Sequence, residues 1–207
     1  MTQRRMDTWT PTRPRAAVAA GALIQAMLGL QFLLGGMNKL LVRDYVAHFR
    51  DFVSSAPGAQ HGVLSQIVQM AVLPHVGIMA QLARFTELSA GIVLLMTATE
   101  LARRRFNMTL GRPLDPAVAL VTAAAATAVG GLSLTIYLLQ GGVVPGVNPA
   151  LAFGPPIAIE LFNVPLAVGI GALEFNRFLA LRNGSIPAAK APIGIGRETA
   201  SPPASTA

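Results

Sequence analysis

The sequence has no cysteine among its 207 residues, and only 12% of its residues are charged. Without cysteine the chain has no disulfide, thiolate metal ligand or dithiol relay, so a redox role requires a bound cofactor or a partner protein. The low share of charged residues argues against an ordinary soluble domain, in which about a quarter of the residues are charged.

Motifs for common cofactors are missing as well. The three histidines, His48, His61 and His75, do not have the spacing of metal ligands. The chain also contains no phosphate-binding loop and no nucleophile elbow, and residues 194–197 (GIGR) are too few for a dinucleotide-binding loop. We therefore expect neither a metal site nor a bound nucleotide.

Hydrophobic residues, by contrast, make up 53% of the chain and are gathered in four long runs. Each run reaches the ~20 residues that a helix needs to cross a bilayer, and a bilayer accepts helices whose outer surface is apolar. No clear cleavage site follows the first run, so we interpret it as a retained helix and not as a signal peptide. The sequence predicts an all-α integral membrane four-helix bundle over residues 16–182, with spans at about 16–41, 72–99, 117–139 and 157–181.

The segments around these spans are polar. Residues 1–15 are interpreted as a flexible cytoplasmic tail, and residues 183–207, rich in Pro, Ala, Gly and Ser, as a disordered cytoplasmic tail. Between the first two spans, apolar residues recur at helical spacing with charged residues between them: Tyr45, Phe49, Phe52 and Val53. This pattern predicts a short amphipathic helix in the first outer loop.

The net charge of +7 comes largely from arginines that flank the apolar runs. Such residues orient a membrane protein, so we expect no nucleic-acid partner. The N-terminal tail holds four arginines, as does the loop between the second and third spans, whereas the opposite side holds only Lys39, Arg43 and Arg50. The positive-inside rule then predicts a multi-pass, N-in/C-in protein with the middle loop in the cytoplasm. We expect its location to be the bacterial inner membrane.

Two charged residues, Arg84 and Glu87, lie inside the second span, where a charge costs at least ~2.5 kcal/mol. Because they are three residues apart on one helical face, we expect them to form an ion pair. One interpretation makes them catalytic residues that bind a polar or anionic ligand, a quinone head group or a proton. The other makes the pair a structural element that fixes helix register.

Further candidates lie toward the outer side. Lys39 and Arg43, with His48 and Arg50, are expected to form a basic mouth that binds an oxyanion substrate, although Lys39 at a span end is also typical of snorkelling to head groups. His75, at the start of the second span, is a further substrate-binding candidate. On the fourth span we expect Glu174 and Arg177 to form a structural pair. For Glu160, a structural role and a functional role both stay open.

Three segments carry a family resemblance. The end of the first run reads GLQFLLGGMNK (residues 29–39), a glycine and an apolar stretch with a Gly-x-x-Lys ending. A proline opens the second run in VLPH (72–75), and a glutamate precedes a small residue, a glycine and an apolar stretch in ELSAGIVLL (87–95). In this order the segments resemble the first two spans of the DoxX/DoxD family. The resemblance covers residues 17–105 and otherwise only the number of spans, and Met96-Thr97 replace a glycine usual in the family.

The resemblance implies a four-helix membrane protein similar to the small membrane subunit of thiosulfate:quinone oxidoreductase. The resemblance implies that Lys39 and Glu87 match functional positions of the family, whereas the role of Arg84 rests on the physical argument alone. We thus expect a membrane subunit of a quinone-linked oxidoreductase that acts on thiosulfate or a related sulfur compound, with a quinone as cofactor. Membrane lipid and a membrane or peripheral subunit are the expected partners. The alternative is a non-catalytic accessory or anchoring subunit, and a small transporter is a third hypothesis.

Overall fold

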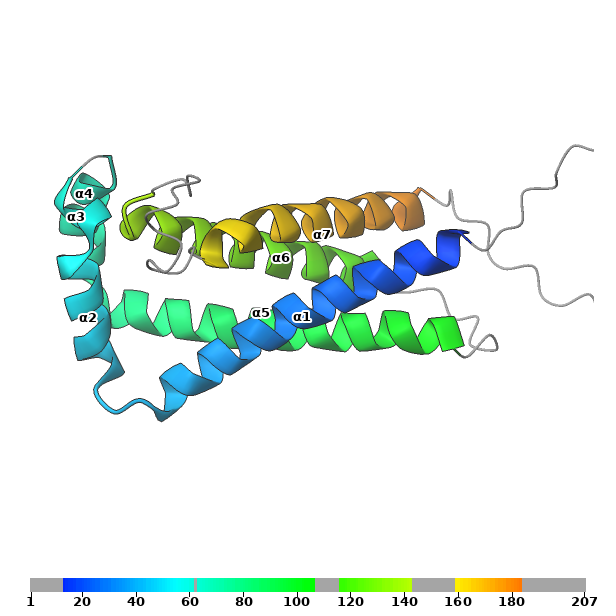
Figure 1. Cartoon of the computed structure of the whole chain (residues 1–207), viewed down its shortest axis with the longest axis horizontal. Coiled ribbons are helices and arrows are strands. Elements are labelled where there is room, and N and C mark those ends of the chain that lie inside the picture. The colour runs from blue at the N-terminus through cyan, green and yellow to red at the C-terminus, as the bar shows by residue number, and fades with distance from the viewer. Residues whose placement is uncertain (1–12, 62, 107–115, 143–158, 184–207) are drawn as a thin grey trace, which may run out of the picture.

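The computed structural model describes residues 13–61, 63–106, 116–142 and 159–183, and every regular element within these ranges is a helix. Four long helices run along the molecule (Figure 1): α1 (Arg13–Leu41), α5 (Val76–Phe106), α6 (Pro116–Leu139) and α7 (Ile159–Arg182). Short helices gather at one end: α2 (Tyr45–Ser55), α3 (Pro57–Gln60), α4 (Val63–Ile67) and the π-helical η1 (Val68–Val72).

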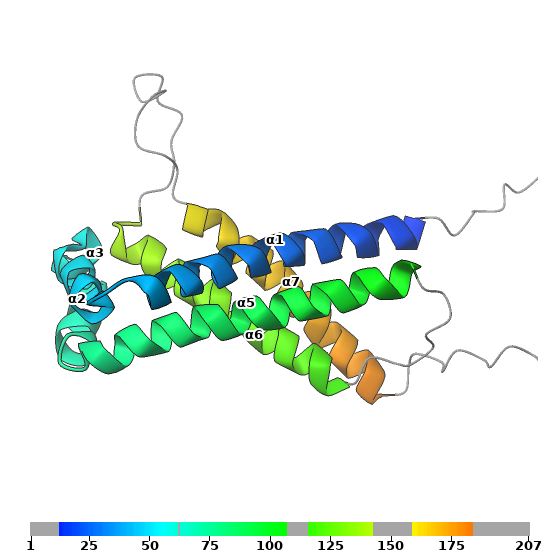
Figure 2. The same ribbon diagram turned by 90° about the horizontal axis from the view of Figure 1, so that it is seen from below.

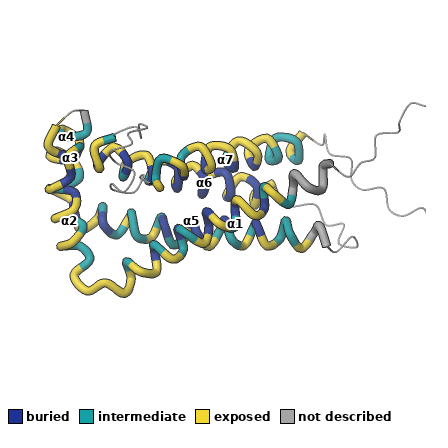
Figure 3. Tube along the Cα trace, in the orientation of Figure 1, coloured by how far each residue is buried: buried dark blue, intermediate teal, exposed yellow. Residues whose placement is uncertain are grey.

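All four long helices are long and apolar enough to cross a membrane. Their outward surfaces are also apolar, as the exposed fractions of Met27 (65%), Met96 (68%) and Leu173 (65%) illustrate, and exposed positions follow the outside of every long helix in Figure 3. In water such a surface would drive aggregation, whereas lipid tails accept it. The structure therefore supports the multi-pass membrane protein predicted from the sequence.

The helix boundaries differ from the predicted spans at three places, of which one is the end of α5 at Phe106 instead of about residue 99. α5 begins at Val76 and not at residue 72, because residues 73–75 form a turn after η1. Proline has no N–H to donate to a preceding helical turn, so Pro74 suits this turn. α1 is already helical from Arg13, inside the segment predicted to be a tail. Most of both predicted tails, residues 1–12 and 184–207, lies outside the described residues.

Glycines allow α1 to pack closely along α5 (Figure 2). A Cβ atom at Gly91 of α5 would lie 2.5 Å from the backbone nitrogen of Leu33, and one at Gly36 of α1 would lie 2.8 Å from that of Leu88. Backbone atoms cannot move aside as a flexible side chain can, so a larger residue at either position would push the helices apart. Close contact between α1 and α5 is what brings their polar side chains together.

Two apolar clusters hold the remaining elements. All four long helices contribute to the central cluster, which includes Leu28, Phe32, Ala90, Leu94, Ala126, Val129, Ala167 and Ile170. The second cluster joins the short helices to the end of α6 and contains Val53, Ala56, Ala59, Val68 and Leu139. α2 occupies the segment predicted to be an amphipathic helix, and it buries Val53 while Phe52 stays 40% exposed.

The long helices alternate in direction. The start of α1 and the ends of α5 and α7 lie at one end of the molecule, opposite the short helices (Figures 1 and 2). For convenience, the end that carries α2, α3, α4 and η1 is called the capped end, and the opposite one the open end.

Candidate functional site

The central polar feature is an ion pair between α1 and α5. The Lys39 ammonium donates hydrogen bonds to both carboxylate oxygens of Glu87. Glu87 is 3% exposed, and the Lys39 side chain is 29% exposed. A carboxylate this deeply buried needs a partner, because an isolated charge in an apolar interior is very costly. Lys39 is that partner, and it reaches Glu87 from the last turn of α1.

Glycine also shapes the space around the pair. A Cβ atom at Gly35 would lie 3.3 Å from Oε2 of Glu87, so the glycine leaves room for the carboxylate against α1. Gly35, Gly36 and Lys39 all belong to the segment that resembles the DoxX/DoxD signature. The structure thus brings together Lys39 and Glu87, the two positions carried over by that resemblance, and gives the neighbouring glycines a packing role.

The predicted ion pair between Arg84 and Glu87 is wrong. Among the described residues the carboxylate of Glu87 pairs with Lys39, while the guanidinium of Arg84 donates to the side-chain oxygen of Gln81. Helical side chains lean toward the N-terminus of their helix. Arg84 therefore extends toward the preceding turn, which holds Gln81, and away from Glu87.

Arg84 also contacts aromatic rings near the capped end. Its guanidinium carbon lies 5.7 Å from the ring centroid of Tyr45 on α2 and 5.4 Å from that of Phe85. Burial, followed by the negative charge of Glu87, raises the pKa of Tyr45 to about 12, while the nearby charge of Arg84 acts in the opposite direction. Nε of Arg84 and the hydroxyl of Tyr45 are buried without a hydrogen-bond partner among the described residues.

An apolar cavity of about 430 Å³ borders the pair on one side. Lys39, Thr86 and Glu87 line one part of it. Most of the remaining lining is apolar and comes from α2, α4, η1, α5 and α6, including Phe49, Phe52, Ile67, Val68, Met79, Leu82, Leu132 and Ile136. Pockets of this size with an apolar lining and few polar groups are typical of small-molecule sites.

A second, polar cavity of about 220 Å³ borders the pair on the side of α7. Lys39 and Glu87 line this cavity too, together with Gln31, Phe32, Gly35, Ser133, Ile136, Glu160 and Asn163. Ser133 and Asn163 are 1% and 3% exposed, and Oγ of Ser133 and Nδ2 of Asn163 have no hydrogen-bond partner among the described residues. The ion pair therefore stands between an apolar cavity and a polar one.

Sequence reasoning missed Ser133 and Asn163. The available signal was weak, because serine and asparagine are uncharged and single polar residues inside an apolar run often face a neighbouring helix. Two glutamines of α1 also face other helices: Gln31 lines the polar cavity, and Gln25 is buried at the contact between α1 and α5.

The other predicted substrate-binding residues lie apart from the ion pair. Arg43 is exposed in the turn between α1 and α2, and His75 is exposed in the turn before α5. Neither lines the two cavities beside the pair. Arg50 and Arg84 border a surface cavity near α2, but Asp44 and Asp51 border it as well. The expected basic mouth therefore has mixed charge at this place.

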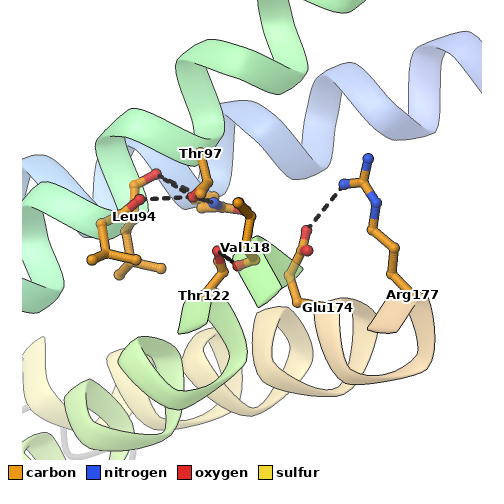
Figure 4. A network of polar contacts seen from close by, with 8 residues as sticks. Leu94, Thr97, Val118, Thr122, Glu174 and Arg177 are labelled. Carbon is orange, nitrogen blue, oxygen red and sulfur yellow. Dashed lines mark hydrogen bonds and ion pairs between the residues drawn. The ribbon is translucent and has the colours of Figure 1, made fainter. Parts of the chain in front are cut away.

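A different polar group lies toward the open end (Figure 4). Glu174 and Arg177 form the ion pair predicted for α7, with 3.6 Å between the carboxylate and guanidinium atoms. Nearby, the amide nitrogen of Gln25 donates to the carbonyl of Leu94 at 3.2 Å and to the hydroxyl of Thr97. Gln25, Glu174 and Arg177 border a mainly apolar cavity of about 440 Å³ between α1 and α7.

Comparisons with known proteins identify no relative. No family model matches the chain, and no curated protein or solved structure matches it either. The likeness to the DoxX/DoxD family therefore stays a prediction. Among the described residues, no group of three or more His, Cys, Asp or Glu side chains is arranged to hold a metal ion.

Proposed function

We propose that the chain is the membrane subunit of a quinone-linked oxidoreductase, similar to the DoxX/DoxD proteins. One observation carries the proposal: a buried Lys39–Glu87 pair at the edge of an apolar cavity of about 430 Å³. A quinone has two carbonyl oxygens on an otherwise apolar ring with an apolar tail. Its head group needs a hydrogen-bond donor, and its tail needs an apolar channel.

The residues around the apolar cavity fit such a molecule. The ammonium of Lys39 has three N–H donors, so it can hold a carbonyl oxygen while it keeps a contact to Glu87. Aromatic and aliphatic side chains of α2 and α6 offer contacts to the ring and the tail: Phe49, Phe52, Leu132 and Ile136. Arg84 does not line this cavity, so in the proposal it positions α2 through Tyr45.

The chemistry required of the protein is proton transfer beside a fixed positive charge. A bound quinone accepts two electrons and two protons in its full reduction. Glu87 is the carboxyl group that can supply a proton next to Lys39, and the ammonium stabilises the negative charge left on Glu87 afterwards. Electrons must come from outside the chain's own side chains, since the sequence has no cysteine.

The electron donor in this proposal is thiosulfate or a related sulfur compound. This part rests on the DoxX/DoxD resemblance. The cavity near α2 with Arg50 and Arg84 is the place where an oxyanion meets two guanidinium groups, although Asp44 and Asp51 reduce its positive charge. A partner subunit that carries the donor site is equally consistent with the proposal.

We further propose that the chain lies in the bacterial inner membrane with both termini in the cytoplasm. The bias of arginines toward the tails and the middle loop supports this orientation. It places the open end inside and the capped end outside. A reporter that is active only outside the cytoplasm, fused after Ala207, should give no signal. A strong signal would reverse the orientation.

The function is tested by quinone reduction in membranes that contain the chain and its partners. Glu87→Gln keeps the shape of the side chain but cannot donate a carboxyl proton, so turnover should fall by about a hundredfold, within the usual range for loss of a general acid. The matched control is Glu174→Gln, which removes the other buried carboxyl group of α5 and α7. Equal turnover in both variants and the natural chain would exclude Glu87 from the chemistry.

A second candidate is an accessory or anchoring subunit. The observation that favours it is the open surface at Gly21 of α1 and Gly169 of α7, where an added Cβ would meet no atom within 4 Å. Both glycines border the cavity between α1 and α7. Small residues on a lipid-facing surface allow a partner helix to approach closely. Purification in a mild detergent would favour this role if a partner co-purified stoichiometrically and the isolated complex bound no quinone.

A further inference from the structure

The polar cavity between Glu87 and Glu160 has no role in the proposed quinone site. Residues of α1, α5, α6 and α7 line it, and its volume of about 220 Å³ leaves room for about seven water molecules at liquid density. Buried cavities hold water when polar partners are present. Here Oγ of Ser133 and Nδ2 of Asn163 are buried and lack partners among the described residues, so they are available to bind water.

We propose that this cavity is a water-filled route by which Glu87 exchanges protons with Glu160. α7 begins in the half of the molecule that carries the capped end (Figure 2). Glu160 lies in its first turn and is partly exposed. It can therefore take up a proton from the medium, while Glu87 is almost fully buried. The inference deepens the proposed function, because it supplies the protons that Glu87 donates.

The charges around the cavity favour protons over an oxyanion. Two carboxyl groups and one ammonium line it, so its net charge is negative when all three are ionised. A sulfur oxyanion would be repelled there, whereas water and an excess proton would not. The charged and titratable groups near Glu87 come from four elements: Lys39 from α1, Tyr45 from α2, Arg84 from α5 itself and Glu160 from α7. The lining residues of α6, Ser133 and Ile136, carry no charge.

The transfer needs no electron donor or acceptor. The O–H bond of the Glu160 carboxyl group breaks, the proton moves along hydrogen-bonded water, and an O–H bond forms on the carboxylate of Glu87. Lys39 keeps its own proton throughout. Glu160 then takes a new proton from the medium, so each cycle returns it to its starting state.

The test follows protonation of Glu87 directly, without quinone turnover. The full chain in lipid nanodiscs receives a pulse of photo-released protons, and time-resolved infrared spectroscopy records the carboxyl band of Glu87. The band is assigned by its loss in Glu87→Gln. With the route intact, Glu160→Gln should slow the appearance of this band by at least about tenfold, as expected when a proton-transfer group is removed. Glu174→Gln, on the same helix but at the other end, should leave the rate unchanged.

A second variant, Asn163→Leu, removes a water-binding amide and narrows the cavity. It should also slow the appearance of the carboxyl band of Glu87. If it fails to fold, Glu160→Gln still decides, because glutamine keeps the shape of glutamate. An unchanged rate in Glu160→Gln would overturn the route. Because no quinone is present, that result would leave the proposed function standing. Conversely, a slowed rate together with unaltered quinone turnover in Glu87→Gln would support the route and reject the quinone proposal.

Discussion

Two buried ion pairs among the described residues differ in how they are built. Lys39 and Glu87 come from different helices, 48 positions apart, and meet only because α1 and α5 pack closely. Glu174 and Arg177 are three residues apart on α7 and meet through helix geometry alone. The first pair stands between two cavities, whereas the second borders one mainly apolar cavity.

The difference shows which pair depends on the fold. A pair within one helix needs no second helix to form and contributes little. A pair between helices needs the correct register and distance of both helices. Any change at the α1–α5 contact should therefore alter the contact between Lys39 and Glu87. This dependence is also why the Lys39–Glu87 pair is the better candidate for a functional site. The following predictions test the contrast.

Loss of Lys39 should have the largest effect. Lys39→Met leaves the buried carboxylate of Glu87 without a partner, which should lower the free energy of unfolding by about 3 kcal/mol. This is the lower end of the range for buried pairs, because the Lys39 side chain is 29% exposed. Thermal unfolding in detergent measures the change. The double variant Lys39→Met/Glu87→Met should recover most of the stability, and no recovery would argue against a direct pair.

A larger residue at Gly91 should have the next largest effect. Gly91→Ala places a methyl group 2.5 Å from the backbone of Leu33 and should destabilise the chain by about 2 kcal/mol, as overpacking does. The α1–α5 pair should weaken while the pair on α7 persists. The control is Gly77→Ala in the same helix, where an added Cβ meets nothing within 4 Å. If both variants unfold at the same temperature, close packing at Gly91 does not determine the contact.

Removal of the pair on α7 should have a smaller effect. Glu174→Gln should change the free energy of unfolding by less than about 1 kcal/mol, because its partner lies three residues away on the same helix and pairs of this kind contribute little. Chemical unfolding in detergent compares it with Glu87→Gln. If Glu174→Gln lowered the free energy of unfolding as much as Glu87→Gln does, the contrast between the two pairs would be contradicted.

A further effect, confined to alkaline pH, is expected at Tyr45. The pKa of Tyr45 is raised from 10.0 to about 12 in the folded chain. Its contribution to stability is thus complete below pH 10 and is lost as the pH rises from about 10 to about 12, since the unfolded chain releases the proton first. Tyrosinate absorbance, taken as the difference between the natural chain and Tyr45→Phe, follows the titration. A midpoint near 10 in the folded chain would show that Tyr45 is not buried against Glu87.

Much of the fold was predictable from the sequence, because an apolar run of about 20 residues is typical of a helix that crosses a bilayer. The four spanning helices and the helix at residues 45–55 followed from run length and spacing. The start of α5 was predicted too early, because the apolar composition continues back through η1 and does not separate it from α5, although Pro74 lies in the turn between them. The pair on α7 was correctly predicted, because three-residue spacing is a local property.

The candidate site was only partly predictable. The sequence identified Lys39 and Glu87 separately, but their contact depends on the relative position of two helices, which local spacing does not contain. The same local rule that worked at Glu174 failed at Arg84, because a second helix offered Glu87 a better partner. Ser133 and Asn163 were missed because an uncharged polar residue in an apolar run does not indicate what it faces.

The most direct test of the quinone site is the binding of a short-tailed quinone by two charge-neutral double variants. Lys39→Gln/Glu87→Gln removes the pair between helices, and Glu174→Gln/Arg177→Gln removes the pair on α7, so neither leaves an unpaired charge. Calorimetric titration should show affinity reduced at least about tenfold in the first, the cost of one hydrogen bond to a charged group. It should show unchanged affinity in the second. Equal affinity in both variants and in the natural chain would contradict a quinone site at Lys39 and Glu87.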